Sequence, residues 1–274
     1  MMRVKIWGTR GSLAAPYPDR MKYGGNTSCV SVQCNDQLVV FDAGTGIREL
    51  GKELEKQEAG KCPDIHLFFG HKHLDHICGF PFFPLLFRKD CRIHLYGEGY
   101  KNQSFRSLMN LIAGPPLWPL TPDQCPAELV WHEIHAGEEI RLKDDLTIRT
   151  LRAAHPDETM IFRLEHDAVG IVYGLDYEIR DESVDNFISF SKNCSLLIFD
   201  GMYTKKEYEI SKGYGHSCWE MSARLCARIQ AEMWCVSHHE WGRTDEELDR
   251  MQSRLESQNR HCFFAREGMT FEWE

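Results

Sequence analysis

Several features that would assign this chain to a specialised class are missing from its sequence. It has 11 cysteines, an odd number, but no Cys-x-x-Cys pair and no spacing typical of a disulfide framework. No apolar run approaches the ~20 residues needed to cross a bilayer. Residues 1–7 predict a strand rather than a secretory signal. We therefore expect a cytoplasmic protein with reduced, mostly buried thiols.

A surplus of basic residues is also absent. The net charge of -9 argues against broad nonspecific binding of nucleic acid, which needs a basic face that displaces counterions. A small phosphorylated substrate is compatible with this charge, because bound metal ions can reverse the local field. Hydrophobic content of 42% and charged content of 27% are ordinary for a globular protein. No linker-like composition interrupts the sequence, so we expect one domain covering residues 1–274.

Short apolar runs separated by turn residues predict many strands and few helices. The predicted strands cover residues 4–7, 29–33, 38–41, 65–69, 92–96, 129–134, 146–151, 161–164, 169–173, 196–199, 233–237 and 269–273. The predicted helices cover residues 46–57, 100–112, 219–230 and 244–257. The last of these has Thr244 as N-cap and Glu247 completing a capping box. Residues 8–25 and the proline-rich residues 113–126 predict long loops.

The densest group of ionisable residues is the segment 71–76, with the sequence HKHLDH, directly after the predicted strand 65–69. Imidazole nitrogens and carboxylate oxygens are the donors that borderline divalent metals prefer. A tight loop can direct His71 and His73 to one side and Asp75 and His76 to the other, which favours two metal ions over one. The alternative, a polar loop with unrelated histidines, accounts poorly for such clustering after an apolar strand.

The segment 71–76 matches the His-x-His-x-Asp-His signature of the metallo-β-lactamase fold superfamily. Further segments match that pattern in the expected order, at residues 7–12, 24–30, 41–46, 154–156, 174–178, 215–217 and 237–239. Over essentially its whole length, the chain resembles the phosphodiesterase and ribonuclease-Z-like branch of this superfamily. The resemblance implies an α/β (α+β) fold, a four-layer αββα sandwich in which two sheets pack face to face with helices outside.

The resemblance also implies seven metal ligands, which are His71, His73, Asp75, His76, His155, Asp176 and His238. It assigns His155 to the first metal with His71 and His73, and His238 to the second metal with Asp75 and His76. The carboxylate of Asp176 would bridge the two ions. Each assignment has a simpler alternative, such as a surface histidine at position 155 or a turn-forming aspartate at position 176.

His216 precedes the predicted helix 219–230, with Ser217 as its candidate N-cap. In the branch that the chain resembles, a histidine at this place approaches the scissile phosphate. We therefore predict that His216 is catalytic, either protonating the leaving oxygen or stabilising charge, with a cap-region histidine as the alternative. Asp75 is predicted to serve catalysis as a metal ligand rather than as a general base.

The sequence allows two alternative roles for each of four other residues. Asp42 is expected to orient a metal-binding histidine or to hold its own turn. Arg10 and Asn26 lie on loops that face the site or that need them for a turn. His239 is expected to point away from the metals, either behind the ligands or exposed to solvent.

The ligand set implies a dinuclear-metal-dependent hydrolase, and the branch implies a phosphodiesterase that cleaves a small phosphodiester by a metal-bound hydroxide. A cyclic nucleotide is one candidate substrate. The alternatives are a hydrolase of a β-lactam, thioester or lactone, a tRNA 3′-processing endonuclease, and a metal-binding sensor without catalysis. Zinc is the favoured ion, with manganese or iron as alternatives.

The expected partner is a small phosphorylated substrate, with no membrane and with nucleic acid only as a ribonuclease-type substrate. The oligomeric state stays open, and a homodimer is one alternative. The surface loop 113–126 is expected to have a plain connecting role by default, with a lid or an oligomer contact as alternatives.

Overall fold

A computed structural model describes residues 1–56, 62–258 and 260–274 of the chain. The chain forms two compact units, each of which combines segments that are distant in the sequence. Unit 1 comprises Met1–Gly8, Asn26–His135 and Glu267–Glu274, and unit 2 comprises Thr9–Gly25 and Ala136–Arg266. Each unit is built on one seven-stranded sheet. A single domain covering residues 1–274 stays a prediction.

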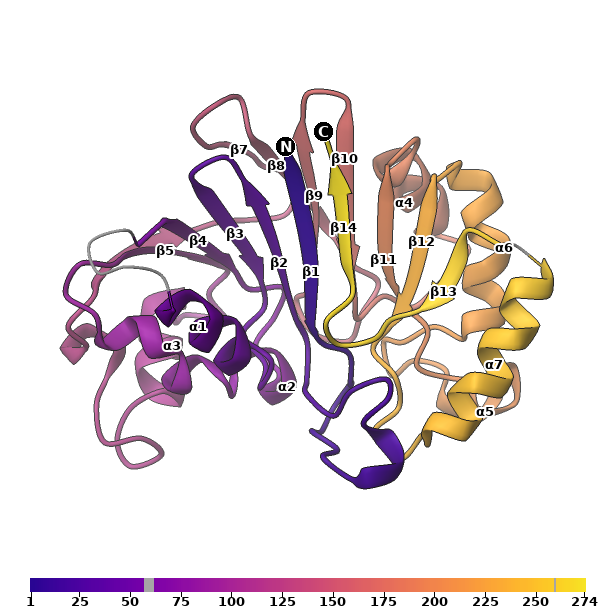
Figure 1. The fold of residues 1–274 in the computed structure, drawn as a ribbon, viewed down its shortest axis with the longest axis horizontal. Coiled ribbons are helices and arrows are strands. Elements are labelled where there is room, and N and C mark those ends of the chain that lie inside the picture. The colour runs from indigo at the N-terminus through magenta and orange to yellow at the C-terminus, as the bar shows by residue number, and fades with distance from the viewer. Residues whose placement is uncertain (57–61, 259) are drawn as a thin grey trace. The chain divides into compact units, whose positions relative to one another are not determined.

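The sheet of unit 1 has the order β14-β1-β2-β3-β4-β5-β6, and Figure 1 labels its strands from β14 to β5. Its strands are β1 (Met2–Gly8), β2 (Cys29–Cys34), β3 (Gln37–Phe41), β4 (Asp64–Phe68), β5 (Arg92–Gly97), β6 (Glu128–Glu133) and β14 (Thr270–Trp273). Pairing is antiparallel from β14 to β3 and parallel from β3 to β6. Because the carboxyl ends of parallel strands meet at one edge, the residues that follow β3 and β4 lie close together.

Helices cover one face of this sheet. They are α1 (Ile47–Glu55), α3 (Phe105–Ile112) and the shorter α2 (Leu74–Ile77), η2 (Phe80–Phe82), η3 (Pro84–Phe87) and η4 (Pro122–Gln124). Leu50 and Leu54 of α1 stand four residues apart and pack in one buried cluster with Leu67 and Leu95 of the sheet. The predicted helix 46–57 is confirmed as α1, except that residue 57 lies outside the described residues.

The sheet of unit 2 has the order β13-β12-β11-β10-β9-β8-β7. Its strands are β7 (Glu139–Arg141), β8 (Thr147–Arg152), β9 (Met160–His166), β10 (Val169–Gly174), β11 (Leu196–Asp200), β12 (Met233–Ser237) and β13 (Cys262–Phe264). Pairing is antiparallel from β7 to β10 and parallel from β10 to β13. Since β8 and β10 are both antiparallel to β9, the strands β8, β10, β11 and β12 all end at the same edge.

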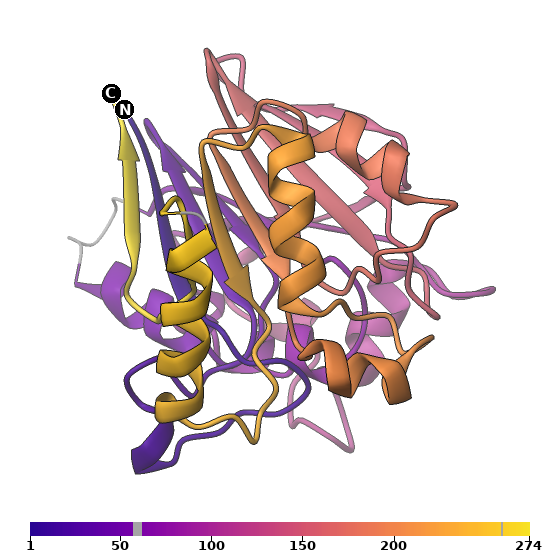
Figure 2. The ribbon, with the colours of Figure 1, turned by 90° about the vertical axis from the view of Figure 1, so that its right-hand side faces the viewer.

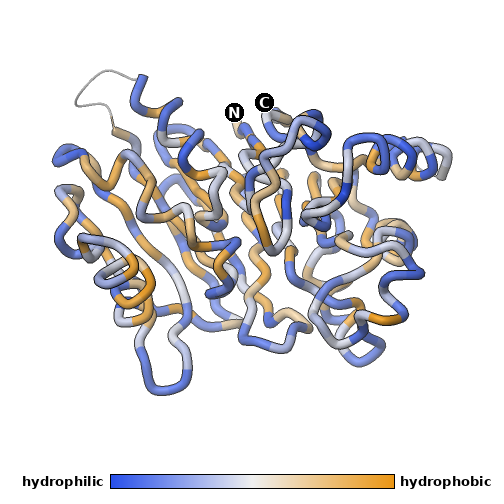
Figure 3. Tube along the Cα trace, turned by 90° about the horizontal axis from the view of Figure 1, so that it is seen from below, coloured by the Kyte–Doolittle hydropathy of each residue, from blue (hydrophilic) through white to orange (hydrophobic). Residues whose placement is uncertain are grey.

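The helices of unit 2 are η1 (Pro18–Arg20), α4 (Val184–Ser191), α5 (Lys205–Ser211), α6 (Trp219–Ile229) and α7 (Asp245–Gln258). Figure 2 shows α4, α6 and α7 along the second sheet, and apolar residues from all three helices pack in one buried cluster with Val172 and Val236. Figure 3 shows hydrophobic stretches of the chain trace alternating with hydrophilic ones. The predicted capping box of α7 is confirmed, because the Thr244 N–H donates to Glu247 at 2.8 Å and the Glu247 N–H donates to the Thr244 hydroxyl at 3.3 Å.

Every predicted strand and helix overlaps an observed element of the same type, and the predicted α/β class with two sheets is confirmed. The short elements β7, β13, α2, α4 and α5 were not predicted. Their sequences are too short or too mixed in polarity for a clear period. Among the described residues, no helix is long and apolar enough to cross a membrane.

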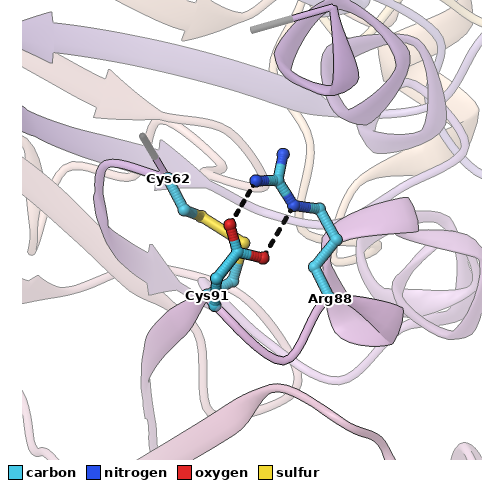
Figure 4. Close-up of a disulfide and its surroundings, with 4 residues drawn as sticks. Cys62, Arg88 and Cys91 are labelled. Carbon is cyan, nitrogen blue, oxygen red and sulfur yellow. Dashed lines mark hydrogen bonds and ion pairs between the residues drawn. A yellow bond between two sulfur atoms is a disulfide. The ribbon is translucent and has the colours of Figure 1, made fainter. Parts of the chain in front are cut away.

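One expectation about the cysteines is wrong. Cys62 and Cys91 form a disulfide, whereas we expected reduced thiols throughout. Figure 4 shows this bond beside Arg88, which forms an ion pair with Asp90 in the turn that leads to Cys91. The two cysteines are 29 residues apart, so their pairing depends on the folded chain and carries no local spacing signal. The other nine cysteines are free, and most of them are buried as expected.

Candidate metal centre

The segment 71–76 of unit 1 leads from the end of β4 into α2. His71, Asp75 and His76 are buried, and His73 is exposed. The ring of His71 lies 4.4 Å from that of His73 and 4.2 Å from that of His76, measured between centroids. Asp75 Oδ2 lies 3.3 Å from His76 Nε2. Unit 1 therefore brings its four predicted ligands together.

Asp42, directly after β3, fixes the orientation of His76. Its Oδ2 lies 2.6 Å from His76 Nδ1, and its Oδ1 accepts a hydrogen bond from the Gly70 N–H at 2.7 Å. Asp42 itself has a φ of 60°, a conformation that costs energy for a residue other than glycine. When Nδ1–H donates to this carboxylate, Nε2 of His76 keeps its lone pair for a metal. The predicted contact of Asp42 with a histidine of the segment is confirmed.

In unit 2, the carboxylate of Asp176 lies between two imidazoles. Its Oδ1 lies 4.0 Å from Nε2 of His155, and its Oδ2 lies 3.4 Å from Nε2 of His238. The side chains of all three residues are almost completely buried. Two donors that each bind one ion at about 2.0–2.1 Å stand roughly 3–4 Å apart. Each oxygen of Asp176 therefore lies at a distance from one histidine Nε2 at which both atoms could bind the same ion. The histidine is a different one for each oxygen.

Two glycines let the backbone approach these histidines closely. A Cβ at Gly215 would lie 2.0 Å from Cδ2 of His155, and Gly215 has a φ of 92°. A Cβ at Gly11 would lie 2.4 Å from Nδ1 of His238. The opposite side of the His155 ring contacts Thr159, whose hydroxyl oxygen is 3.1 Å from Nδ1. Any larger residue at either glycine would therefore displace an imidazole.

His216 lies beside this cluster in unit 2. Its Nδ1 is 2.8 Å from Oδ2 of Asp200, and its ring stacks on that of His238 at a centroid distance of 4.9 Å. Donor atoms of Asp176, His216 and His238 all lie within 4.8 Å of one another. Only 8% of His216 is exposed. The structure thus places the predicted catalytic histidine next to two predicted ligands and orients it through Asp200.

Asp200 is a site residue that the sequence analysis missed. Besides His216, it accepts hydrogen bonds from the backbone N–H groups of Asp176 at 3.1 Å, Met202 at 3.1 Å and Ser217 at 3.2 Å. It ends the buried strand β11, just as Asp42 follows the buried strand β3. An acidic residue directly after an apolar strand is the signal that could have identified it.

The prediction that Ser217 caps the helix α6 is wrong. The N-cap is Cys218, which makes no side-chain capping bond. The hydroxyl of Ser217 instead donates to the carbonyl of Tyr177 at 2.7 Å and accepts from the Ile179 N–H at 3.0 Å. The hydroxyl therefore ties Ser217, the residue after His216, to the loop that follows β10.

His239 is buried, which contradicts one of its two expected environments. It is 1% exposed, its Nε2 donates to the carbonyl of Ala265 at 2.8 Å, and its ring meets the edge of Tyr23 at 6.0 Å. Burial, followed by the charge of Arg10, lowers the pKa of His239 to about 3. His239 is therefore a neutral core residue, and the expectation of an exposed side chain is wrong.

Arg10 and Asn26 have the turn roles that were one of their two alternatives. Arg10 is buried, and its guanidinium donates to the carbonyls of Gly24 and Arg243, both at 2.7 Å. Asn26 donates from its side-chain amide to Glu267 at 2.9 Å. These bonds hold loops within unit 2 and unit 1, respectively.

The donors in both units suit a divalent metal ion. Each unit offers buried imidazoles and a carboxylate, and in unit 1 a second carboxylate, Asp42, fixes the predicted ligand His76 through Nδ1. Support of a metal-binding histidine by a carboxylate is a general feature of zinc sites. The fold and these donors define a class of α/β proteins that bind metal at the carboxyl ends of their strands.

The chain belongs to the β-lactamase superfamily, whose domain model matches residues 37–239. It is 21% identical to Ribonuclease Z of Haloarcula marismortui over an alignment of 286 positions, which covers 86% of this chain and 86% of that relative. The metallo-β-lactamase fold protein YhfI of Bacillus subtilis is 18% identical and has a TM-score of 0.73, with 99% of both chains covered. A diphosphatase of the PhnP family is also 18% identical and has a TM-score of 0.75, with 100% of this chain and 98% of that chain covered. The resemblance identified in the sequence is confirmed.

Proposed function

We propose that the chain is a dinuclear-metal-dependent phosphodiesterase that hydrolyses a small phosphodiester. The proposed metal ligands are His71, His73, Asp75 and His76 from unit 1 and His155, Asp176 and His238 from unit 2. The observation that carries the proposal is the position of Asp176, whose two oxygens face the Nε2 atoms of two different histidines. A carboxylate so placed can serve two ions, as an imidazole cannot without losing a proton. Zinc is the favoured ion, with manganese or iron as alternatives.

The chain's own residues have separate tasks in this proposal. When bound, divalent ions activate water and neutralise charge on the phosphate. His216 holds a proton at Nε2 for the leaving oxygen, while Asp200 fixes its ring through Nδ1 at 2.8 Å. Asp75 acts as a ligand beside His76, whose ring Asp42 fixes. The burial of the Asp176 cluster limits access of bulk water to these groups.

The names of two relatives support a phosphoester substrate. One is a diphosphatase of the PhnP family, and the other is Ribonuclease Z of Haloarcula marismortui. The second relative also supports RNA cleavage as an alternative function. The net charge of -9 weighs against it, because an extended RNA substrate needs a basic surface.

Metal-defined protein and a panel of substrates test this proposal. Protein stripped of metal and reloaded with zinc or manganese should bind two equivalents and hydrolyse bis(p-nitrophenyl) phosphate or a cyclic nucleotide. Precursor tRNA, a cephalosporin, a thioester and a lactone complete the panel. Saturation at one equivalent would contradict the dinuclear site, and activity confined to a substrate other than a diester would contradict the phosphodiesterase.

A matched pair of variants strengthens the test. Asp176→Asn should weaken binding of both ions, because it removes the carboxylate that both are proposed to share. Asp185→Asn, which alters an exposed residue that pairs with Arg228 on the surface, should leave metal binding unchanged. Loss of only one ion from Asp176→Asn would show that this carboxylate does not bridge.

A further inference from the structure

Glu178 is a buried carboxylate that belongs neither to the proposed metal ligands nor to the proposed catalytic groups. It is 2% exposed and stands two residues after Asp176. Its Oε1 accepts hydrogen bonds from the Tyr208 hydroxyl at 3.0 Å and the Gly213 N–H at 2.8 Å, and its Oε2 accepts from Arg180 at 2.7 Å. Both oxygens of the Glu178 carboxylate are therefore held by hydrogen bonds.

Glu178 connects the segments that carry two residues of the site. Its backbone N–H donates to the carbonyl of Ala154 at 2.9 Å, directly before His155. Its side chain holds Gly213, three residues before His216, at 2.8 Å. One residue thus joins the loop of His155 to the turn of His216.

Packing contributes little to holding the outer part of this turn, at Gly213 and Tyr214. Tyr214 is 65% exposed, and the place where a Cβ of Gly213 would point has no atom within 4 Å. Gly213 and Gly215 have φ values of 89° and 92°, which give the turn a shape suited to glycine. At Gly215 the backbone lies against the ring of His155, so this end of the turn is fixed by packing and the outer end depends on Glu178.

We infer that Glu178 is a positioning residue, whose carboxylate fixes the turn at residues 211–215 and thereby places His216 beside Asp176. This inference rests on the proposed role of His216 as the proton donor to the leaving oxygen. Glu178 has no contact with the reacting atoms in this scheme. Its effect on the rate passes through His216 alone.

The main test is Glu178→Gln, which keeps the size of the side chain but replaces one acceptor oxygen with an amide donor. The variant should keep its metal content and its circular dichroism spectrum. Its kcat for methyl phenyl phosphate should fall by about 10- to 100-fold, the usual effect of a small misplacement of a reacting group. Its kcat for methyl p-nitrophenyl phosphate should fall less, because p-nitrophenolate leaves readily without a proton.

Two further variants complete the set. Tyr208→Phe removes one of the donors to Glu178 and should shift both rates in the same direction by smaller factors. If Glu178→Gln does not fold, the same comparison of the two rates is made with Tyr208→Phe. Glu246→Gln is the matched control, because Glu246 lies on α7 of the same unit and forms an exposed ion pair with Arg250. It should leave both rates unchanged.

A double-mutant cycle separates positioning from a general structural effect. In a His216→Ala background, Glu178→Gln should cause no further loss, since the group it positions is gone. A further loss equal to that in the wild-type background would overturn the inference and leave the proposed function standing. Equal losses on both esters would overturn it as well. Unchanged rates for His216→Ala would overturn both the inference and the proton-donor role.

A measurement without turnover gives an independent readout. The ring ¹⁵N resonances of His216 should shift or broaden in Glu178→Gln, whereas those of His239, in the core of the same unit, should not. If the wild type hydrolyses no diester but the His216 resonances respond as expected, the proposed function fails and the positioning role stands. Unaltered His216 resonances would overturn the positioning role.

Discussion

At the scale of single residues, neighbours in the sequence have very different surroundings. His238 faces Asp176 at 3.4 Å, while His239 donates to the carbonyl of Ala265 at 2.8 Å in the core. His238 has a φ of 60°, which turns the chain sharply at this point. The identity of a residue alone therefore does not separate a proposed ligand from a core histidine.

We expect His238→Ala to affect metal content and His239→Ala to affect stability. His238→Ala should lose one metal ion and keep most of its stability. His239→Ala should keep both ions but lose about 1–3 kcal/mol of unfolding free energy, the usual cost of breaking a buried hydrogen bond. Metal titration and urea unfolding of both variants measure this. Loss of metal from His239→Ala alone would show that the two assignments are reversed.

A second prediction concerns the close approach of Gly11 to His238. Gly11→Ala should push the imidazole out of place, since the new Cβ would lie 2.4 Å from its Nδ1. We expect the affinity for one ion to fall by about 10- to 100-fold, the range seen when the support of a ligand is removed. Competition with a chelator of known affinity measures the change.

Gly170→Ala on β10 is the control for Gly11→Ala. Its Cβ would come within 3.2 Å of the Arg163 guanidinium, a milder approach that a shift of a few tenths of an ångström relieves. This variant should bind metal as the wild type does. If Gly11→Ala matched it, the steric argument for Gly11 would be wrong.

At the scale of elements, the strands β5 and β6 carry a histidine pair outside the proposed centre. Nδ1 of His94 lies 3.0 Å from Nε2 of His132, and the two rings stack at 5.2 Å. Burial, followed by the charges of His132 and Arg92, lowers the pKa of His94, and burial lowers that of His132. Both histidines are therefore harder to protonate in the folded chain than in the unfolded chain.

This pair predicts a loss of stability in mild acid. As the pH falls below the unfolded pKa of about 6.5, the unfolded chain binds protons that the folded chain does not, so the free energy of unfolding decreases. The double variant His94→Gln/His132→Gln should show a smaller decrease. Urea unfolding of metal-free protein at pH 7.5 and 5.5 tests this without interference from metal release. An equal decrease in both proteins would rule out this contribution.

At the scale of the whole molecule, the Cys62–Cys91 disulfide restricts the unfolded chain. The two residues are 29 positions apart, and a bridge of this kind contributes about 2–4 kcal/mol to stability. Dithiothreitol should therefore lower the urea midpoint of the wild type. The variant Cys62→Ser/Cys91→Ser should start at the lower midpoint and respond little to the reductant.

Cys125→Ser provides the control for the disulfide. Cys125 is a free, partly buried thiol in unit 1, so this variant should respond to dithiothreitol as the wild type does. A wild-type midpoint that did not change on reduction would show that the bridge adds nothing to stability.

The sequence by itself determined those features that depend on neighbouring residues. Apolar alternation determined the strands, the Thr244–Glu247 spacing determined the cap of α7, and the HKHLDH segment after an apolar strand identified the donors of unit 1. Each of these signals lies within a few residues, because the strand period, a helical turn and a metal-binding loop are all short.

Only the tertiary structure decided which distant groups meet. Asp200 and His216 are 16 residues apart, and Ser217 and Tyr177 are 40 apart, so no local pattern predicts either contact. The parallel order of β10, β11 and β12 brings the ends of these strands to one edge, where Asp176, Asp200 and His238 converge. That convergence arises from strand pairing and burial between segments that lie far apart in the sequence. The same cause gives His239 its place in the core and Cys62 its partner.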